Sequence, residues 1–361
     1  METNFEFDNG TYNLVRYPKT EDGSLRAWSN AELLVLEYIK DKSFDQAHLF
    51  NDRFGVWNCT LHTKKLATVW TYASQKKAVN QNLLLNNLEE KGVFKTPLDD
   101  LEHVELALLK IPKSLELFEL FLHQITKSAS ETTEVVCGFM TKYFSPSYLK
   151  IAEQYFEDVS QSKAWKKARL LILKSPKKRQ EKEFLNSISW RGRDLKQYYG
   201  VFSSGHIDIG TQFLLEHISI HPEEQLVLDL ASGNGIIASE VLKFNTESEV
   251  TLIDDFNLAV ESSKLNLDNA RAHFFCNDTL ENLPKTYFNL VVSNPPFHFE
   301  HENNIEVSTR LFVEVKECLT TNGRFVLVAN KHLNYKTHLL KIFKQVSILK
   351  ENTKFIIYEC S

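Results

Sequence analysis

The sequence predicts an α/β protein with two domains, each built on a largely parallel sheet. Three observations favour this class. The chain has 361 residues, more than one ordinary domain needs. Its hydrophobic content of 43% is enough for two cores. In both halves, apolar runs of strand length alternate with helical patterns, which is typical of strands joined by crossover helices.

The first half, residues 11–175, opens with a helix signal. Ser29 and Glu32 have the spacing of a capping box, followed by the apolar positions Leu33, Leu34, Leu36 and Ile39. Strands are expected at 47–50, 66–70, 104–110 and 134–138, with helices near 75–88 and 114–125. The loop 51–55 after the first strand holds a single glycine, too few for a turn that approaches a cofactor. This half is therefore predicted to lack a cofactor site.

Composition excludes several classes of protein. The formal charge of -5, from 42 basic and 47 acidic residues, does not indicate a nucleic-acid-binding protein as a whole. The five cysteines have no CxxC or zinc-like spacing, which argues against a disulfide framework or structural metal and favours a reducing cytoplasm. We expect no export signal at the acidic start of the chain, no membrane span and no metal.

A basic stretch with interleaved aromatic residues lies between the halves, from Lys163 to Lys196. Such a mixture suits both phosphate neutralisation and base stacking. The alternative is a solvated linker, because short Lys/Arg runs are common. With the rest of the chain acidic, RNA binding is slightly favoured. The candidate RNA-binding residues are Lys166, Lys167, Arg169, Lys177, Lys178 and Arg179, together with His298 further along.

The second half contains a glycine-bearing turn after a buried strand. The segment 200–211 leads into a helix at 212–218, and the apolar strand 226–230 then runs into a turn at 231–235. One strand later, Asp254 is placed to accept hydrogen bonds from ribose hydroxyls, and Asn277-Asp278 follows a third strand, where it could read an adenine edge. The candidate cofactor-binding residues are Asp208, Gly210, Asp229, Ala231, Gly233, Gly235, Asp254, Asn277 and Asp278.

The stretch 290–298 is the centre of the predicted site. An apolar strand ends there in Asn294, Pro295, Pro296 and Phe297, and the prolines stop the ladder and fix φ. The Asn294 side-chain oxygen and the carbonyl of the next residue can both accept hydrogen bonds from a planar NH2 group, and the aromatic ring can stack on the ring that carries the amine. These four residues are the candidate catalytic residues.

The remaining elements complete a seven-stranded sheet. A helix is expected near 304–318, a turn at Gly323, a strand at 324–329 and another helix at 335–343. A closing hairpin at 346–350 and 354–358 makes the last strand antiparallel. This order fits a methyltransferase sheet.

The glycine turn and the Asn-Pro-Pro-Phe tetrad each have an alternative interpretation. A nicotinamide dehydrogenase also has such a turn, but residues 231–235 fail the G-x-G-x-x-G pattern. S-adenosylmethionine has no pyrophosphate to seat on a helix, so a looser turn suffices. The tetrad alone could be a plain turn, because Asn-Pro is common turn chemistry. Glycine turn, ribose acid, Asn277-Asp278 and tetrad occur in order at successive strand ends, which favours a methyltransferase.

These residues resemble a known family. Asn294-Pro295-Pro296-Phe297-His298, the segment 328–335 and the segment 202–210 are similar to the bacterial rRNA guanine-N2 methyltransferases with a duplicated Rossmann-like domain. In the first half, residues 14–18, 110–115 and 164–169 also match the large-subunit, 23S-type member. The resemblance thus covers nearly the whole chain.

The resemblance implies two tandem Rossmann-like class I methyltransferase domains. The expected division is a degenerate copy at 1–175 for folding or RNA recognition, a basic linker at 176–199, and a catalytic domain at 200–361 with a seven-stranded sheet. One departure is Ala231-Ser232-Gly233 where the family has Gly-Cys-Gly. A methyl group at Ala231 is expected to crowd the cofactor or alter the turn, with activity surviving.

The expected activity is S-adenosylmethionine-dependent methylation of guanine N2 in 23S rRNA by direct transfer, without metal, in a cytoplasmic monomer. The alternatives are a 16S rRNA guanine-N2 enzyme and, in another class, an inactive RNA-binding or ribosome-assembly protein on the same fold. Adenine N6 or a protein glutamine would also suit the tetrad, although the basic stretch and the duplicated domains argue against a protein substrate.

Overall fold

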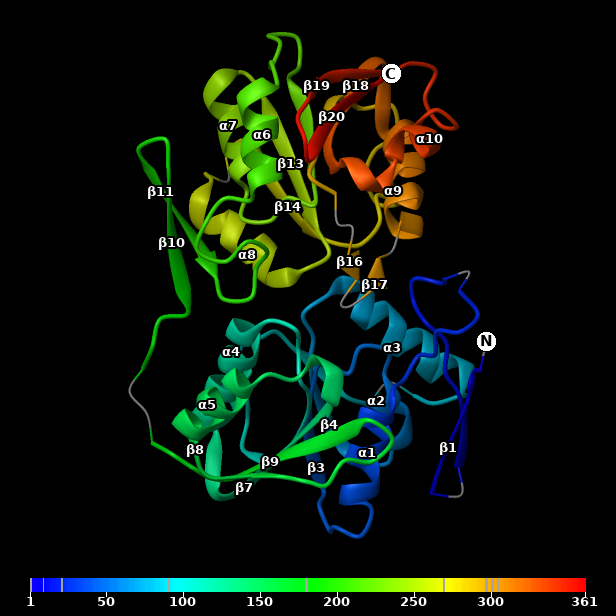
Figure 1. Cartoon of the computed structure of the whole chain (residues 1–361), viewed down its shortest axis with the longest axis vertical. Coiled ribbons are helices and arrows are strands. Elements are labelled where there is room, and N and C mark those ends of the chain that lie inside the picture. The colour runs from blue at the N-terminus through cyan, green and yellow to red at the C-terminus, as the bar shows by residue number, and fades with distance from the viewer. Residues whose placement is uncertain are drawn as a thin grey trace. The chain divides into compact units, whose positions relative to one another are not determined.

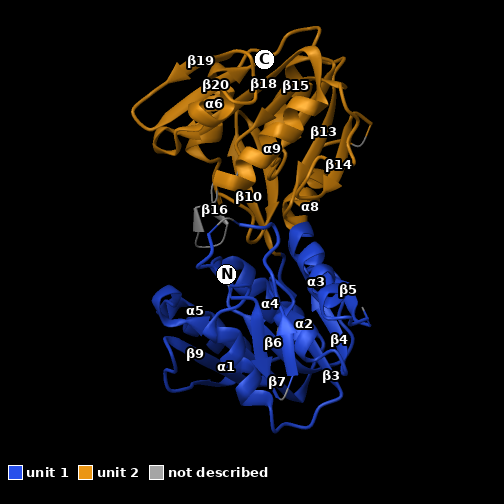
Figure 2. Cartoon of the chain, turned by 90° about the vertical axis from the view of Figure 1, so that its right-hand side faces the viewer, with its two compact units in different colours: residues 1–183 blue, residues 184–361 orange. Residues whose placement is uncertain are grey.

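The structure is a computed structural model that describes residues 2–8, 10–20, 22–89, 91–178, 181–268, 270–295, 298–299, 302–303 and 305–361. The chain divides into two compact units, Met1–Glu183 and Phe184–Ser361 (Figure 2). Each has its own seven-stranded sheet. The predicted fold class, two tandem class I methyltransferase domains, is confirmed.

Unit 1 has the strand order β5-β4-β3-β6-β7-β9-β8 (Figure 1). The strands β3 to β7 run parallel, whereas β9 is antiparallel to both its neighbours. The strands are β3 (Gln46–Phe50), β4 (Lys65–Val69), β5 (Val93–Lys95), β6 (Val104–Lys110), β7 (Ala129–Met140), β8 (Phe156–Gln161) and β9 (Ala168–Pro176). The helices are α1 (Asn30–Ile39), α2 (Val56–Thr60), α3 (Ala73–Leu85), α4 (Leu115–Lys127) and α5 (Pro146–Tyr155), with the short η1 (Thr141–Tyr143). A hairpin of β1 (Asn4–Phe7) and β2 (Gly10–Asn13) precedes them.

Unit 2 repeats this order as β14-β13-β12-β15-β18-β20-β19. Its strands are β12 (Leu226–Leu230), β13 (Glu249–Asp254), β14 (Ala272–Cys276), β15 (Phe288–Ser293), β18 (Leu319–Asn330), β19 (Val346–Glu351) and β20 (Phe355–Cys360). Its helices are α6 (Ile209–His217), α7 (Ile236–Phe244), α8 (Asn257–Asn266), α9 (Ile305–Cys318) and α10 (Tyr335–Leu339), with the short η2 (Lys331–Leu333). The small strands β16 (His298–Phe299) and β17 (Glu302–Asn303) lie between β15 and α9.

Helices cover both faces of the unit 2 sheet. Along β15, Leu290 and Val292 belong to one buried cluster and Val291 to another, because successive side chains of a strand point to opposite faces. The first cluster includes Val241 of α7, and the second includes Phe312 of α9. Buried on both faces, β15 must be almost wholly apolar until it ends, as predicted.

Several elements differ from the sequence-based expectations. The capping box at Ser29 and Glu32 is present, but the strand expected at 134–138 is the longer β7. The strands β8 and β9 were not predicted; β8 is mostly polar, and β9 falls within the stretch that was interpreted by its basic residues.

Most of the expected linker, 176–199, is instead a hairpin of unit 2. β10 (Leu185–Trp190) and β11 (Arg193–Tyr198) pair throughout their length, and β11 packs on α8. Arg191 and Arg193 both form ion pairs with Glu240 of α7, whose carboxylate is buried. These two basic residues therefore attach the hairpin to its own unit.

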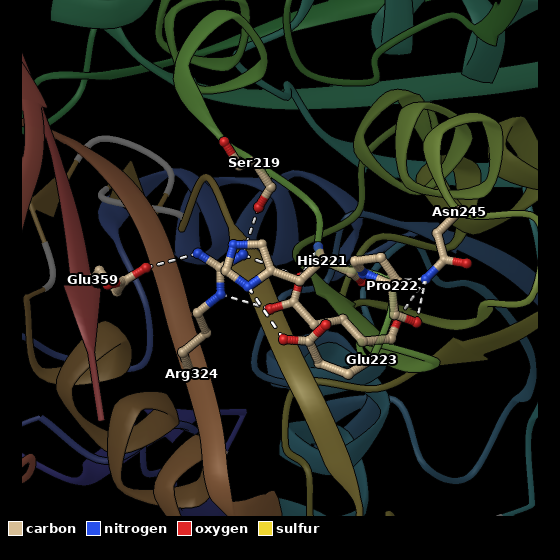
Figure 3. A network of polar contacts seen from close by, with 8 residues as sticks. Ser219, His221, Pro222, Glu223, Asn245, Arg324 and Glu359 are labelled. Atoms are coloured by element: carbon tan, nitrogen blue, oxygen red, sulfur yellow. Dashed lines mark hydrogen bonds and ion pairs between the residues drawn. The ribbon is translucent and has the colours of Figure 1, made fainter.

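A largely buried arginine, Arg324, joins several elements at the edge of the unit 2 sheet where the parallel strands begin (Figure 3). Arg324 of β18 donates from Nε to Glu224 Oε1 at 2.6 Å and from Nη1 to Glu359 Oε2 at 2.7 Å. Its Nη2 donates to the Ser219 carbonyl. Asn245 at the end of α7 donates in turn to the Glu224 carbonyl. This network ties β18, β20 and α7 to the segment before β12.

Candidate functional site

The candidate site lies at the carboxyl edge of the unit 2 sheet. The parallel strands β12, β13, β14 and β15 all end at this edge, so the residues that follow them are brought together. The sequence-predicted residues that follow these strands are Ala231, Gly233, Gly235, Asp254, Asn277, Asp278, Asn294 and Pro295.

The turn after β12 is built on three residues with positive φ. These are Ala231 (58°), Gly233 (56°) and Gly235 (80°). A Cβ at Gly235 would lie 3.0 Å from Leu267 and 3.1 Å from the Ser263 hydroxyl, so glycine lets α8 pack closely. A Cβ at Gly233 would meet nothing within 4 Å. Open space therefore faces the backbone at Gly233, as a cofactor site requires.

Asp254 ends β13 beside this turn. Its Oδ2 accepts from the Gly233 N–H at 2.9 Å, and its Oδ1 accepts from the Phe256 N–H at 2.9 Å. Burial raises the pKa of Asp254 to about 6, even though these two hydrogen bonds act to lower it. A preorganised carboxylate next to Gly233 suits the predicted role of accepting ribose hydroxyls.

Asp229 lies beneath the turn. It is fully buried, and its Oδ2 accepts from the Ala238 N–H in the first turn of α7 at 3.0 Å. Burial places the pKa of Asp229 well above its ordinary range. Its contact with α7 connects the end of β12 to the helix that follows the turn.

Asn277 and Asp278 follow β14. The Asn277 N–H donates to the Asp254 carbonyl, which ties this segment to β13. Arg310 of α9 donates from Nη2 to both the carbonyl and Oδ2 of Asp278, each at 3.1 Å. The Asp278 carboxylate therefore has a cationic partner within the chain, which the sequence did not indicate.

Asn294 is held by residues from the start of α6. Its Nδ2 donates to Asp208 Oδ2 at 3.0 Å and to Thr211 Oγ1 at 2.9 Å. Asp208 is also the N-cap of α6 and accepts from the Thr211 N–H. A carboxylate only accepts hydrogen bonds, so the amide nitrogen of Asn294 must face Asp208. The amide oxygen Oδ1 faces the other way, and none of the described residues donates to it.

Gly210 is needed for this contact. A Cβ there would lie 2.9 Å from Asp208 Oδ2 and 3.1 Å from the Phe355 ring. The structure thus places the predicted residues Asp208 and Gly210 around Asn294. Thr211 belongs to the same group and was missed, because a single threonine in a helix has no distinctive pattern.

A second missed group attaches the β10–β11 hairpin to the glycine turn. Asn266 of α8 donates from Nδ2 to the Asn234 and Lys196 carbonyls at 2.9 and 2.8 Å, and its Oδ1 accepts from the Lys196 N–H. Asn234 donates to Gln197, whose amide donates to the Val201 carbonyl. The turn, the hairpin and the start of the 200–211 segment are therefore linked.

Unit 1 has the same local frame with different side chains. β3 ends at Phe50 as β12 ends at Leu230, so the loop 51–55 corresponds to the turn 231–235. Asn82 repeats the contacts of Asn266, to the Phe54 and Val15 backbone. Asn51 and Gly55 keep the positive φ of the positions they match.

The residues that serve the unit 2 site are replaced in unit 1. Arg53 stands at the position of Gly233, is buried, and donates to Ser74 at 2.7 Å. Trp70 stands at the position of Asp254. At the position of Asn294, Lys110 forms an ion pair with Glu32 at 2.6 Å. Unit 1 therefore keeps positive φ at two of the three turn positions, but it has neither a glycine at the middle position nor a carboxylate at the position of Asp254.

The candidate RNA-binding residues lie mainly on the β8–β9 hairpin of unit 1. Lys166 and Lys167 form its exposed turn, whereas Arg169 donates to the Ser162 carbonyl and is half-buried. Lys177 pairs with Glu157, and Lys178 is exposed. Arg179, Pro296 and Phe297 lie outside the described residues, as does the side chain of His298.

Across the described part of the chain, no three His, Cys, Asp or Glu side chains are grouped so that they could hold a metal ion. Among the same residues, no helix combines the length and apolar character needed to span a membrane.

Ala231→Gly is expected to stabilise unit 2 by about 0.5–1 kcal/mol. The left-handed conformation costs a residue with a Cβ about 1–2 kcal/mol, and the greater backbone entropy of glycine offsets part of the gain. The shift of the urea unfolding midpoint measures the effect. Asn51→Gly is the matched control: its φ is also 58°, but the Asn51 side chain donates to the Lys110 carbonyl, so no gain is expected. An unchanged or lower midpoint for Ala231→Gly would contradict the assignment of strain.

The fold and the open, acid-flanked glycine turn define a class I methyltransferase. Residues 2–179 match the family model described as RLMG N-terminal domain, and residues 192–359 match the one described as Methyltransferase small domain. The two domain matches follow one another and together cover nearly the whole chain. The resemblance seen in the sequence is thereby confirmed, as are the predictions of a methyltransferase enzyme and of S-adenosylmethionine as cofactor.

One solved structure shares the fold over nearly the whole chain. The Thermus thermophilus 16S rRNA N2 G1207 methyltransferase RsmC, in complex with AdoMet and guanosine, is 20% identical, with a TM-score of 0.78 over 99% of this chain and 97% of that chain. A TehB-like SAM-dependent methyltransferase from Corynebacterium glutamicum is 14% identical, with a TM-score of 0.34 over 44% of this chain and 90% of that chain.

Cofactor affinity is expected to fall in acid. Because the pKa of Asp254 is raised to about 6, its carboxylate becomes protonated as the pH falls from 7 to 5 and loses its capacity to accept from two hydroxyls. Affinity should fall about tenfold per pH unit below the pKa. Calorimetry with S-adenosylmethionine between pH 5 and 8 measures this. The Asp254→Asn variant should bind S-adenosylmethionine more weakly, with an affinity that does not change with pH. A wild-type affinity that is independent of pH would refute the role of Asp254.

Proposed function

We propose that the chain methylates the exocyclic N2 of a guanine in 23S rRNA. The orientation of Asn294 carries this proposal. Asp208 and Thr211 hold its amide nitrogen, which leaves Oδ1 to accept from a substrate. The Pro295 carbonyl is proposed as the second acceptor. A planar NH2 group that bridges the two acceptors is the substrate group this pair fits.

The residues for the cofactor are those around the open space at Gly233. Asp254 would accept the ribose hydroxyls, and Ala231, Gly233 and Gly235 would form the turn beneath them. When bound there, S-adenosylmethionine supplies an electrophilic methyl group.

Catalysis by the chain's own residues is a matter of positioning. Asn294 Oδ1 and the Pro295 carbonyl would each accept a hydrogen bond from one N2–H group. These two bonds fix the plane of the amine and direct its lone pair. Both hydrogen bonds strengthen as positive charge develops on N2, so they stabilise the transition state more than the ground state. The surplus proton then leaves to water. Phe297 is proposed to stack on the base, drawn from a loop or flipped from a helix.

Two observations support different rRNA substrates. The RLMG N-terminal domain match over residues 2–179 favours the large-subunit RNA. The similar Thermus thermophilus structure, a 16S rRNA enzyme with bound guanosine, favours guanine N2 as the target and leaves 16S rRNA as the second candidate. We propose unit 1 for folding or RNA recognition, and we propose that the enzyme acts in the cytoplasm, where rRNA is found.

The test is a comparison of rRNA from cells with and without the protein. The 16S and 23S molecules are separated, digested with nuclease and analysed for N2-methylguanosine by mass spectrometry. Loss of one N2-methylguanosine from 23S rRNA is expected. Loss from 16S rRNA selects the second candidate, and unchanged N2-methylguanosine in both rejects guanine N2 as the target.

A further inference from the structure

The turn of the β8–β9 hairpin has an unusual backbone. Trp165 and Ala168 exchange two hydrogen bonds of 2.8 and 2.7 Å, so the loop between them has only two residues. Those residues, Lys166 and Lys167, have φ values of 44° and 65°. Type I′ turns require positive φ at both positions, which Asn-Gly adopts readily and two lysines do not. We call Trp165–Ala168 the lysine turn.

Two other hairpins of the chain carry less strain. The two-residue turn of the β10–β11 hairpin has Arg191 (φ 45°) at its first position but glycine, Gly192, at its second. In unit 2, the β19–β20 hairpin lies where the β8–β9 hairpin lies in unit 1. Its turn is capped by Asn352, whose side chain accepts from the Lys354 and Phe355 N–H groups, and it needs no positive φ. The fold therefore does not require strained lysines at this place.

The strained backbone is held firmly from two sides. Asn30 at the start of α1 donates to the Lys166 carbonyl at 2.9 Å, and the Thr141 N–H donates to the Lys167 carbonyl at 2.9 Å. Both carbonyls of the turn are thus fixed by hydrogen bonds from other elements of unit 1. A strained, rigidly supported turn is more typical of a functional site than of a connection.

The lysine turn presents cations beside aromatic rings. Lys166 and Lys167 are exposed, and neither forms an ion pair with any residue that the structure describes. The Lys166 ammonium lies 4.5 Å from the centre of the Trp165 ring. Lys142, which directly follows Thr141, lies 4.3 Å from the ring of the exposed Tyr143. Three lysines and two aromatic rings are thereby gathered at one edge of unit 1.

We propose that the lysine turn is an RNA-contacting element of unit 1, at which Lys166 and Lys167 bind phosphates and Trp165 stacks on an unpaired base. The inference deepens the proposed function, on which it rests for the identity of the RNA. Lysines without an ion-pair partner neutralise phosphates, and aromatic rings stack on bases without regard to sequence; the Trp165 ring is half-buried and keeps part of its surface accessible. The backbone strain is tolerated because it directs both lysines outward together.

Replacing the two lysines with Asn-Gly, the sequence favoured in type I′ turns, separates the effect of the turn on stability from its effect on RNA binding. In Lys166→Asn/Lys167→Gly the backbone strain is relieved, so the melting temperature should rise by a few degrees. Affinity for an rRNA fragment should fall on the order of tenfold, with the slope of log K against log salt shallower by about 1.4 for two lost contacts. A turn with a purely structural role would gain stability and lose nothing.

Two controls define the outcome. Lys166→Arg/Lys167→Arg keeps both charges and should bind RNA as the wild type does. Lys40→Gln/Lys65→Gln removes two exposed lysines from the other end of the unit 1 strands and should leave binding unchanged. Equal affinity and salt slope for the Asn-Gly variant and the wild type would overturn the inference. Fluorescence anisotropy measures RNA binding without turnover. Its result therefore tests the lysine turn independently of which RNA group the enzyme methylates.

Discussion

Replacing Asn294 with alanine is expected to lower kcat on rRNA by about 10²–10³-fold and to leave cofactor affinity unchanged. This range is the usual cost of removing one preorganised polar group that acts on the transition state. Asn294 contacts Asp208 and Thr211 rather than the glycine turn, so the cofactor site should be intact. Single-turnover rates and calorimetry with S-adenosylmethionine measure the two effects separately.

The matched control lies on the same strand. Asn289 accepts from the Leu226 N–H at the amino end of β15, far from the carboxyl edge, so Asn289→Ala should lower stability slightly and leave kcat unchanged. Asp208→Asn should give a smaller loss than Asn294→Ala, because the Asn294 amide is then no longer fixed in one orientation. Wild-type kcat in Asn294→Ala would refute the assigned role.

Arg324→Leu is expected to destabilise unit 2 by about 3–5 kcal/mol. The substitution leaves Glu224 buried without its cation, and an uncompensated buried charge is costly. Figure 3 shows that the same guanidinium also reaches Glu359 and Ser219, so several elements lose a common support. Urea unfolding followed by fluorescence measures the change.

An exposed pair provides the comparison. Arg26 and Glu2 lie 3.3 Å apart at the surface of unit 1, so Arg26→Leu should cost less than about 1 kcal/mol. In unit 2, Glu224→Gln added to Arg324→Leu should recover part of the loss, because no buried charge is then left unpaired. A cost below 1 kcal/mol for Arg324→Leu would show that the network contributes little.

The fold could be predicted because its pattern is local. Buried strands such as β12 and β15 are short apolar runs, and the residues that end them, Gly233 and Asn294, are recognisable in sequence. The parallel order of strands then brings these residues to one edge.

The contacts that hold the site could not be predicted in the same way. Asn294 and Asp208 are 86 positions apart, and Asn266 lies 70 positions from Lys196. Hydrogen-bonded pairs at such separations produce no repeating pattern in the amino-acid sequence. The sequence predicts a basic linker at 176–199, because its lysines and arginines interrupt the apolar alternation. In the fold, Arg191 and Arg193 both form ion pairs with Glu240.

The replacement of Gly233 by Arg53 in unit 1 fixes how many cofactor molecules one chain takes up. The Arg53 side chain is buried, and its guanidinium lies 5.2 Å from the centre of the Tyr72 ring. Because this large side chain stands where unit 2 has a glycine, we expect only unit 2 to bind the cofactor, with saturation at one equivalent per polypeptide. Despite two copies of one architecture, titration curves should be simple hyperbolas without cooperativity.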